Sequence, residues 1–317
     1  MLAHHDIGRA GELVQPPCRR RMAQLMSAPD PAALVEKCRV TPGKAMRLAD
    51  RDPADRMGLS GADANAMLAA GAERLAALHD RLFARRTWSV LMVLQGMDAS
   101  GKDGAIKRLA AGLNPQGLRV TSFAAPNAQE LSHDFLWRIH RALPPRGMVG
   151  VFNRSHYEDV LVPRVDAAVL ARQGLPDSLA GPEIWTQRLG AIAAFETYLA
   201  QQGTALAKVF LHISRDEQRK RLLARLGDPA KEWKFDPSDT AARDRWAEYQ
   251  PAYDAAFNAT ATSLAPWYIV PADSKPVARA LTQAILLTTM AGLDLDTPAP
   301  SPERLAEMAK ARNQLKA

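Results

Sequence analysis

Cysteine is scarce in this sequence, and long apolar runs are absent. Only Cys18 and Cys38 occur among 317 residues, and they form no Cys-x-x-Cys pair, so we expect neither a disulfide framework nor a cysteine-ligated zinc site. No run reaches the ~18 apolar residues that a membrane-spanning helix needs, and the first residues hold no apolar signal core. We therefore expect a protein of the reducing cytoplasm, with no membrane partner.

The balance of charge is basic. Lysine and arginine number 41 against 34 aspartates and glutamates, which gives a net charge of +7 and a pI near 9.6. Such a balance favours anionic partners, among them nucleic acid, a membrane surface and polyphosphate. Hydrophobic residues make up 47% of the chain, as is ordinary for a globular protein with one large domain or a core domain with extensions.

Apolar runs alternate with amphipathic stretches from residue 61 onward, which is the pattern of an α/β protein with a parallel sheet. Ligands of such sheets gather beyond the carboxyl ends of the strands. We expect a poorly ordered extension over residues 1–30, a phosphotransferase domain over 31–293, and a tail with a short helix over 294–317. Strands are predicted near residues 88–94, 118–123, 147–153, 206–213 and 267–271, and helices near 61–85, 103–113, 128–142, 182–202, 215–226, 239–257 and 276–291.

The most informative segment follows the first predicted strand. Residues 96–104 read Gly-Met-Asp-Ala-Ser-Gly-Lys-Asp-Gly, which contains the Gly-x-x-x-x-Gly-Lys core of a phosphate-binding loop. Glycines let backbone N–H groups surround a polyanion, and Lys102 adds a charge at the start of a helix whose dipole also favours anions. A glycine-rich turn with a surface lysine is the alternative. Phosphate contacts are predicted from Gly96, Ala99, Ser100, Gly101, Lys102, Asp103 and Gly104.

The residue after Lys102 departs from the usual motif. A serine or threonine whose hydroxyl binds Mg²⁺ usually stands there, whereas this chain has Asp103, with Asp98 inside the loop. Two carboxylates would repel a phosphate unless divalent cations lay between them, and Mg²⁺ prefers oxygen ligands. We therefore expect Mg²⁺ as the cofactor, held in a different way.

A second polar segment, residues 153–164, follows the third predicted strand. Arg154 has the planar fork that binds phosphate through two hydrogen bonds, and the Asp159 carboxylate suits Mg²⁺. A surface loop with internal salt bridges is the alternative, but the position at a strand end favours function. His156 is expected to be structural or positioning, because a phosphate acceptor is already an anion and needs little help from a base.

Two further segments admit both functional and structural interpretations. A basic helix near 215–226 runs into a turn rich in lysine and aromatics, where phosphoryl-transfer enzymes carry a mobile lid that excludes water, so we place a lid at about 214–240. An ordinary basic surface is the alternative, and the cations of this helix cannot all share one face, so some must be solvated. In residues 133–138, Phe135 and Trp137 either line a base pocket or belong to the core of a helix.

With these segments assembled, the chain resembles the polyphosphate kinase 2 family over roughly residues 35–290. The resemblance implies a P-loop kinase-like fold similar to thymidylate kinase, with a parallel sheet flanked by helices and a helical lid. It also implies Mg²⁺-dependent transfer between inorganic polyphosphate and nucleotides. The Asn-Arg-Ser-His-Tyr-Glu-Asp form of the second segment is similar to the class III subgroup, which acts on AMP and ADP. The matching segments are residues 96–104, 133–138, 152–162, 228–235 and 266–273.

Carried over by position, the resemblance gives individual residues their roles. Asp98 and Asp159 are implied as Mg²⁺ ligands, and Lys102 and Arg154 as phosphate clamps. These four are the expected catalytic residues. Further phosphate contacts, in the lid or channel, are implied for Arg215, Lys231 and Lys234. Nucleotide contacts are expected from Asn153, Arg154, Ser155, Glu158 and Arg164.

The expected reaction is reversible transfer from polyphosphate to AMP or ADP, giving ADP or ATP, by a homo-oligomer without a nucleic-acid partner. An ATP-dependent nucleotide kinase is one alternative, since it shares the loop and lid but needs an adenine pocket for its donor. A non-catalytic polyphosphate-binding protein is the other, and it predicts salt-dependent binding without turnover. The set of Lys102, Asp98 and Asp159 speaks against a mere binder.

Overall fold

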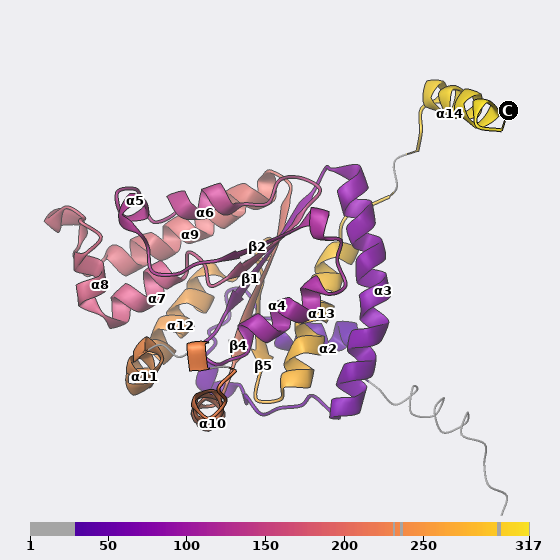
Figure 1. The fold of residues 1–317 in the computed structure, drawn as a ribbon. Coiled ribbons are helices and arrows are strands. Elements are labelled where there is room, and N and C mark those ends of the chain that lie inside the picture. The colour runs from indigo at the N-terminus through magenta and orange to yellow at the C-terminus, as the bar shows by residue number, and fades with distance from the viewer. Residues whose placement is uncertain (1–28, 231, 235–236, 297–298, 317) are drawn as a thin grey trace, which may run out of the picture.

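A computed structural model describes residues 29–230, 232–234, 237–296 and 299–316 (Figure 1). Of the expected extension over 1–30, all but the last two residues lie outside the described residues. Lys231 lies outside them as well.

The described part of the chain forms one parallel sheet of five strands in the order β2-β3-β1-β4-β5. All five predicted strands are confirmed, and so is the parallel α/β fold. The central strand β1 is apolar over nearly its whole length and buried at every position, as expected for a strand covered on both faces. The strands are β1 (Ser89–Gln95), β2 (Leu118–Ser122), β3 (Val149–Asn153), β4 (Thr204–His212) and β5 (Trp267–Pro271).

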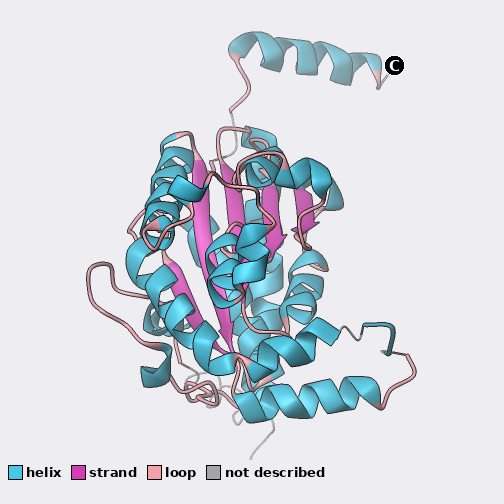
Figure 2. Ribbon diagram, turned by 90° about the vertical axis from the view of Figure 1, so that its left-hand side faces the viewer, coloured by secondary structure: helices cyan, strands magenta, loops and turns pink. Residues whose placement is uncertain are grey.

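Helices cover both faces of the sheet (Figures 1 and 2). Side chains of β1 alternate between two cores: Val90 and Met92 pack in the first, and Leu91 and Val93 in the second. Helices α2 (Pro31–Cys38), α3 (Gly61–Arg85), α4 (Lys102–Ala110) and α13 (Lys275–Ala291) cover the first core. Helices α6 (Trp137–Ala142), α7 (Glu158–Val165), α9 (Ile184–Gln201) and α12 (Trp246–Thr260) cover the second.

The other helices lie at the margins of this body. They are α5 (Ala128–Leu131), α8 (Ala167–Ala171), α10 (Arg215–Leu226), α11 (Pro237–Asp244) and α14 (Pro302–Gln314). Helix α14 stands apart from the sheet and is exposed along its length (Figure 1). None of the helices that the structure describes combines the length and the apolar character needed to span a bilayer.

The helix predicted over 128–142 is wrong, because the chain forms α5 and α6 there with a turn between them. The turn is made by short polar side chains that bond the backbone locally. Asp134 Oδ1 accepts from the N–H of Leu136 (2.9 Å), and Ser132 Oγ donates to Gln129 O (2.8 Å). Such bonds compete with helical ones. The helix predicted over 239–257 is likewise divided, into α11 and α12.

Helix α7 was not predicted, and Pro163 inside it explains why. Proline has no N–H to donate to the carbonyl four residues earlier, that of Asp159, and usually ends a helix. Here Arg188 of α9 supplies the missing hydrogen bond, with Nη1 2.8 Å from Asp159 O. A contact from another helix thus makes the proline tolerable, and a local reading of the sequence cannot detect it.

Candidate active site

The phosphate loop joins β1 to α4 through backbone that only glycine accommodates easily. Gly96 has φ 150°, and a Cβ there would lie 2.7 Å from Ser100 Oγ and 2.8 Å from Leu211 O. Gly101 has φ 111°, directly before the first residue of α4. Ala99 also has a left-handed φ, 60°, which is uncommon for a residue with a side chain. The loop therefore has the tight, strained form that a phosphate cradle requires.

Lys102 folds back over the loop that precedes it. Its Nζ donates to Gly96 O (2.6 Å) and Met97 O (3.3 Å), and the residue is only 8% exposed. Burial and, secondly, the charge of Arg154 lower the pKa of Lys102, and the nearby carboxylates only partly oppose this. A phosphate in the loop would supply the negative charge that favours the protonated amine.

Arg154, the first residue after β3, reaches across to the loop. Its Nη2 donates to Asp98 Oδ1 (2.5 Å) and its Nη1 to Glu158 Oε2 (3.2 Å). Glu158 raises the pKa of Arg154 strongly in spite of burial, so the guanidinium is always charged. Its φ of 64° is left-handed, and this turn of the backbone carries the side chain toward the loop. The structure thus brings Asp98, Arg154 and Glu158 together, as the sequence predicted for a common site.

The carboxylates at the loop fit a hard cation as partial ligands. Asp98 and Glu158 share Arg154, and Asp103 Oδ1 accepts from Asn153 Nδ2 (3.1 Å). Among the described residues, no group of three acidic, histidine or cysteine side chains is placed to hold a metal by itself. Mg²⁺ is often bound through one or two carboxylates plus substrate phosphates. The donor set fits that mode, in which substrate completes the site.

Helix α10 holds the loop in place through Gln218 and Arg221, for which the sequence predicted no contact with the loop. Arg221 Nη1 donates to the carbonyls of Ala99 (3.1 Å) and Ser100 (3.0 Å), and its Nη2 donates to the two carbonyls after β5 (2.7 and 2.9 Å). Gln218 Nε2 donates to Asp98 O (3.1 Å). Both side chains are buried, on the face that α10 turns to the loop. Gln218 and Arg221 are three residues apart, so a helix places them on one face, and this spacing is the only sequence signal for their shared contact with the loop.

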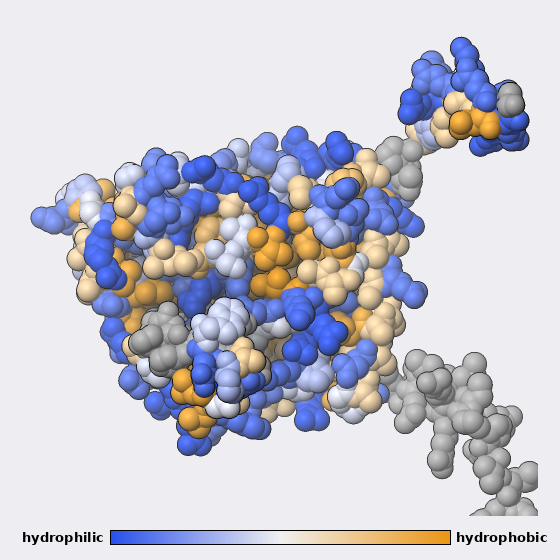
Figure 3. Space-filling model, viewed as in Figure 1, coloured by the Kyte–Doolittle hydropathy of each residue, from blue (hydrophilic) through white to orange (hydrophobic). Residues whose placement is uncertain are grey.

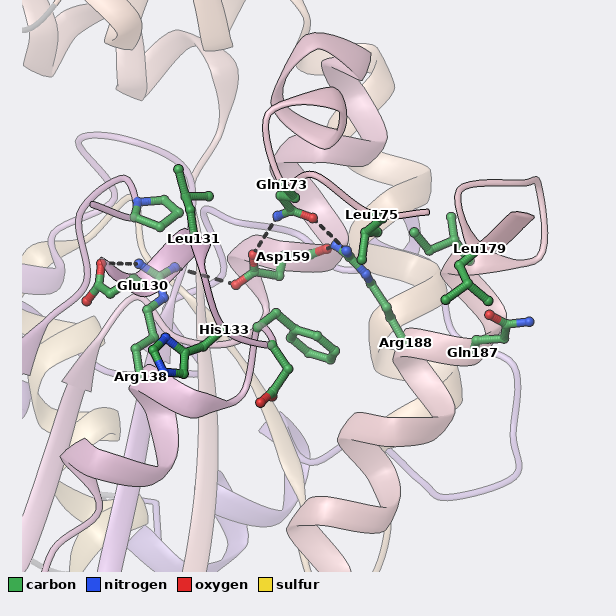
Figure 4. A pocket seen from close by; sticks show the side chains of 14 residues that line it. Glu130, Leu131, His133, Arg138, Asp159, Gln173, Leu175, Leu179, Gln187 and Arg188 are labelled. Carbon is green, nitrogen blue, oxygen red and sulfur yellow. Dashed lines mark hydrogen bonds and ion pairs between the residues drawn. The ribbon is translucent and has the colours of Figure 1, made fainter. Parts of the chain in front are cut away.

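Asp159 faces a separate cavity of about 210 Å³ between the α5–α6 segment, α7 and α9 (Figure 4). Its Oδ2 lies 3.4 Å from Arg138 Nη2, and its Oδ1 accepts from Gln173 Nε2 (3.0 Å). Burial raises the pKa of Asp159, although Arg138 and Arg188 oppose the rise. The two carboxylates expected to bind the metal therefore have different partners here, Arg154 for Asp98 and Arg138 for Asp159.

The walls of this cavity mix apolar and aromatic side chains with charged ones, and Arg138 and Arg188 lie on opposite sides of Asp159 (Figure 4). The Arg188 guanidinium lies over the Phe135 ring, 5.2 Å from its centroid. Leu131, Leu175 and Leu179 also line it. Trp137, the other candidate for a base pocket, is not part of the lining and instead stacks on His133 with ring centroids 4.0 Å apart. The cavity combines an aromatic ring and two guanidinium groups with the carboxylates of Glu130, Asp134 and Asp159, so it offers a ring contact and charged partners of both signs to a small ligand.

Other predicted residues lie elsewhere. Ser155 is fully buried, and its Oγ accepts from the N–H of Tyr157 (3.2 Å). Arg164, on α7, and Arg215, at the start of α10, are exposed and do not line the cavity. The side chain of Lys234, like Lys231, is outside what the structure describes.

Comparison with known proteins decides the family. Residues 58–298 match the family model of polyphosphate kinase 2. The chain belongs to the polyphosphate kinase 2 family. It is 44% identical over 244 residues to an ADP-polyphosphate phosphotransferase of Rhodopseudomonas palustris. The aligned residues cover 77% of this chain and 84% of that protein. It is 43% identical over 268 residues to an AMP/ADP-polyphosphate phosphotransferase of Meiothermus ruber, covering 84% and 96%.

A solved structure supports the same assignment. The crystal structure of polyphosphate kinase 2 from Arthrobacter aurescens matches with a TM-score of 0.80 at 42% sequence identity, over 90% of this chain and 98% of that one. The expected resemblance and the P-loop kinase-like fold are therefore confirmed.

The chain also has a fully buried polar cluster next to Arg154 in sequence. Lys208 Nζ of β4 donates to Glu196 Oε2 of α9 (2.5 Å), and Tyr157 OH donates to Glu196 Oε1 (2.8 Å). His156 Nε2 lies 3.2 Å from the same oxygen. None of these side chains is more than 1% exposed. The buried position of His156 and its contact with Glu196 are consistent with the structural role expected for it. The cluster holds the residues that directly follow Arg154 in place.

Proposed function

We propose that this protein transfers phosphoryl groups from inorganic polyphosphate to AMP and ADP in a reversible, Mg²⁺-dependent reaction that yields ADP and ATP. The observation that carries the proposal is the pairing of a phosphate loop with the Arg154 guanidinium at one edge of the sheet. The names of its relatives, which act on ADP or on both AMP and ADP, support the choice of substrates.

In the proposed reaction, an oxygen of the nucleotide's terminal phosphate attacks the terminal phosphorus of polyphosphate. The phosphoanhydride bond to the next unit breaks, and the chain leaves one phosphate shorter. Loop N–H groups and Lys102 hold the end of the chain, and Arg154 leaves Asp98 to stabilise the transferring group. Mg²⁺, when bound, supplies the charge that offsets repulsion between the two polyanions.

The ligands proposed for the metal are Asp98 and Asp159. Asp98 lies within the loop and is paired with Arg154, and ligation by Asp159 requires its ion pair with Arg138 to open. We place the acceptor nucleotide in the cavity lined by Phe135 and Arg188, with its phosphates toward Arg154 and Asn153. The aromatic ring gives the base a stacking partner, and the guanidinium groups face the anionic end.

An assay of purified protein tests the function directly. With Mg²⁺ and long-chain polyphosphate, we expect ATP from ADP, and ADP followed by ATP from AMP, and we expect EDTA to abolish both. Product should be measured by luminescence and by chromatography of nucleotides. Product formation from ATP plus a nucleoside monophosphate, with none from polyphosphate, would instead establish the ATP-dependent nucleotide kinase.

Replacing Phe135 with alanine tests the nucleotide cavity. Since stacking of a base on an aromatic ring is worth ~1–3 kcal/mol, we expect the KM for ADP to rise about 10-fold or more, with the KM for polyphosphate nearly unchanged. Trp137→Ala is the matched control, because this neighbouring aromatic lies outside the cavity lining. An equal effect of both variants on the KM for ADP would contradict the assignment.

A further inference from the structure

The central strand β1 ends in a glutamine whose side-chain amide is unpaired. Gln95 is 0% exposed, and neither its Nε2 nor its Oε1 has a hydrogen-bond partner among the residues that the structure describes. Ser89, the polar residue at the other end of β1, is paired, with its Oγ 2.9 Å from Thr204 Oγ1. The hydrophilic side chains that cover much of the face seen in Figure 3 can bond water, but a fully covered amide cannot. Since an unpaired buried amide destabilises the folded chain, its presence points to a role outside the observed arrangement.

The Gln95 side chain lies on the face of the sheet that α7 and α12 cover. Side chains alternate between the two faces along a strand, and Leu91 and Val93 of β1 pack in the core of that face. Helix α7 begins at Glu158, whose carboxylate accepts from Arg154. The Gln95 amide and the ion pair of Arg154 with Glu158 are therefore on the same side of the sheet.

Arg154 and Asp98 are the charged residues next to Gln95 in the strands and the loop. The N–H of Arg154 donates to the carbonyl of Leu94 (3.0 Å), so Arg154 follows β3 at the level where Gln95 ends β1, one strand spacing of ~4.8 Å away. Asp98 comes three residues after Gln95, and it accepts from Arg154. On the other side of β1, strand β4 places Phe210 in register with Gln95, and a phenyl ring has no amide partner to offer. The hydrogen-bonding partners available to Gln95 across the strands are thus on the side of Arg154.

An amide has one suitable group for each member of the Arg154–Asp98 pair. Its oxygen can accept from a guanidinium, and its nitrogen can donate to a carboxylate. In the observed arrangement the pair is closed, with Arg154 Nη2 bonded to Asp98 Oδ1, and the Gln95 amide has neither partner. The proposed reaction requires the pair to open, because Arg154 leaves Asp98 for the transferring phosphoryl group. Opening alone would take one hydrogen bond from each of the two charged groups.

We propose that Gln95 is a positioning residue for the open form of this pair: its Oε1 accepts from the Arg154 guanidinium, and its Nε2 donates to Asp98, once the two have separated. The inference rests on the proposed function, which supplies the reason for the pair to open. The amide has no hydrogen bond to lose when the pair opens, and it then forms two with charged groups. Gln95 therefore stabilises the open form relative to the closed one, and such a difference is what shifts an equilibrium between two states.

Replacing Gln95 with methionine tests this role, because methionine has a similar length and no amide. We expect kcat/KM for ADP in the presence of polyphosphate to fall about 10-fold, as for the loss of a hydrogen bond to a charged group. The melting temperature without substrate is expected to rise by about 2–4 °C, because the unpaired buried amide is gone. A residue that merely supports the fold would behave differently, since its loss would lower activity and melting temperature together.

Gln283→Met is the matched control, because it removes a buried amide from α13, away from the Arg154–Asp98 pair. Its kcat/KM is expected to stay within about twofold of the wild type. Gln95→Asn keeps the amide but draws it back by one methylene, so we expect a loss of kcat/KM without the gain in melting temperature. Unchanged kcat/KM in either Gln95 variant, or a lower melting temperature of Gln95→Met, would overturn the proposal. Wild-type protein without activity on any polyphosphate would refute the proposed function itself, whereas an active enzyme with unaffected Gln95 variants refutes only the role of Gln95.

Discussion

Lys102→Ala is expected to reduce kcat for ATP formation from ADP and polyphosphate by about 10²–10³-fold, the usual effect of removing one preorganised charge at a transition state. In the proposed reaction Lys102 contacts the end of the phosphate chain, from which the negatively charged phosphoryl group is transferred. The amine is held by the carbonyls of Gly96 and Met97, so it needs little reorganisation when substrate arrives. Turnover should be measured at saturating substrates, together with the melting temperature.

A matched control separates this role from general charge. Lys107→Ala removes an exposed lysine from the same helix, and its kcat is expected to stay within about twofold of the wild type. Lys102→Arg keeps the charge but exchanges a compact ammonium for a broad planar group, so we expect it to remain strongly impaired. A Lys102→Ala enzyme that folds and retains more than a tenth of wild-type kcat would sink the assignment of Lys102 as a catalytic residue.

The strands and the phosphate loop could be predicted because their signals are local. A strand covered on both faces is a short apolar run, and β1 is such a run. The loop requires glycine where φ is positive and where a Cβ would collide, and both conditions hold at Gly96. Parallel connectivity then carries the ends of β1 and β3 to one edge, which is why Asp98 and Arg154 meet as expected.

The other features of the fold and of the candidate site depend on contacts between segments that are distant in the sequence. Nothing near Arg221 indicates that it bonds the loop more than a hundred residues earlier, and it was grouped with cations of which some had to be solvated. Helix α7 exists in spite of Pro163 because Arg188 of α9 bonds the free carbonyl. Asp159 was expected to bind the metal together with Asp98, and the sequence did not indicate that Arg138 and Gln173 bond its carboxylate in the neighbouring cavity. Which groups these side chains contact depends on tertiary packing, and a short sequence motif does not specify that packing.

Glu196→Gln is expected to lower the free energy of unfolding by about 3–5 kcal/mol, because it leaves the buried Lys208 without its counter-ion. Burial alone would raise the pKa of Glu196, but Lys208 and His156 hold it below its usual value. Burial lowers the pKa of Lys208, and Glu196 is what opposes that effect. The variant should also raise the KM for polyphosphate, since Tyr157, which Glu196 holds, lies three residues from Arg154. Denaturant unfolding and steady-state kinetics measure the two effects.

The pH dependence of the Glu196→Gln variant distinguishes a lost charge pair from ordinary packing damage. Without Glu196 the pKa of Lys208 falls further below that of the unfolded chain. Between the folded and unfolded pKa values the unfolded state binds more protons, so the stability of the variant rises with pH. We therefore expect its deficit relative to the wild type to shrink from pH 7 to pH 9. The double variant Glu196→Gln, Lys208→Met has no buried charge and should recover most of the lost stability at every pH. A deficit that is independent of pH and persists in the double variant would mean that the pair is not what stabilises the Arg154 turn.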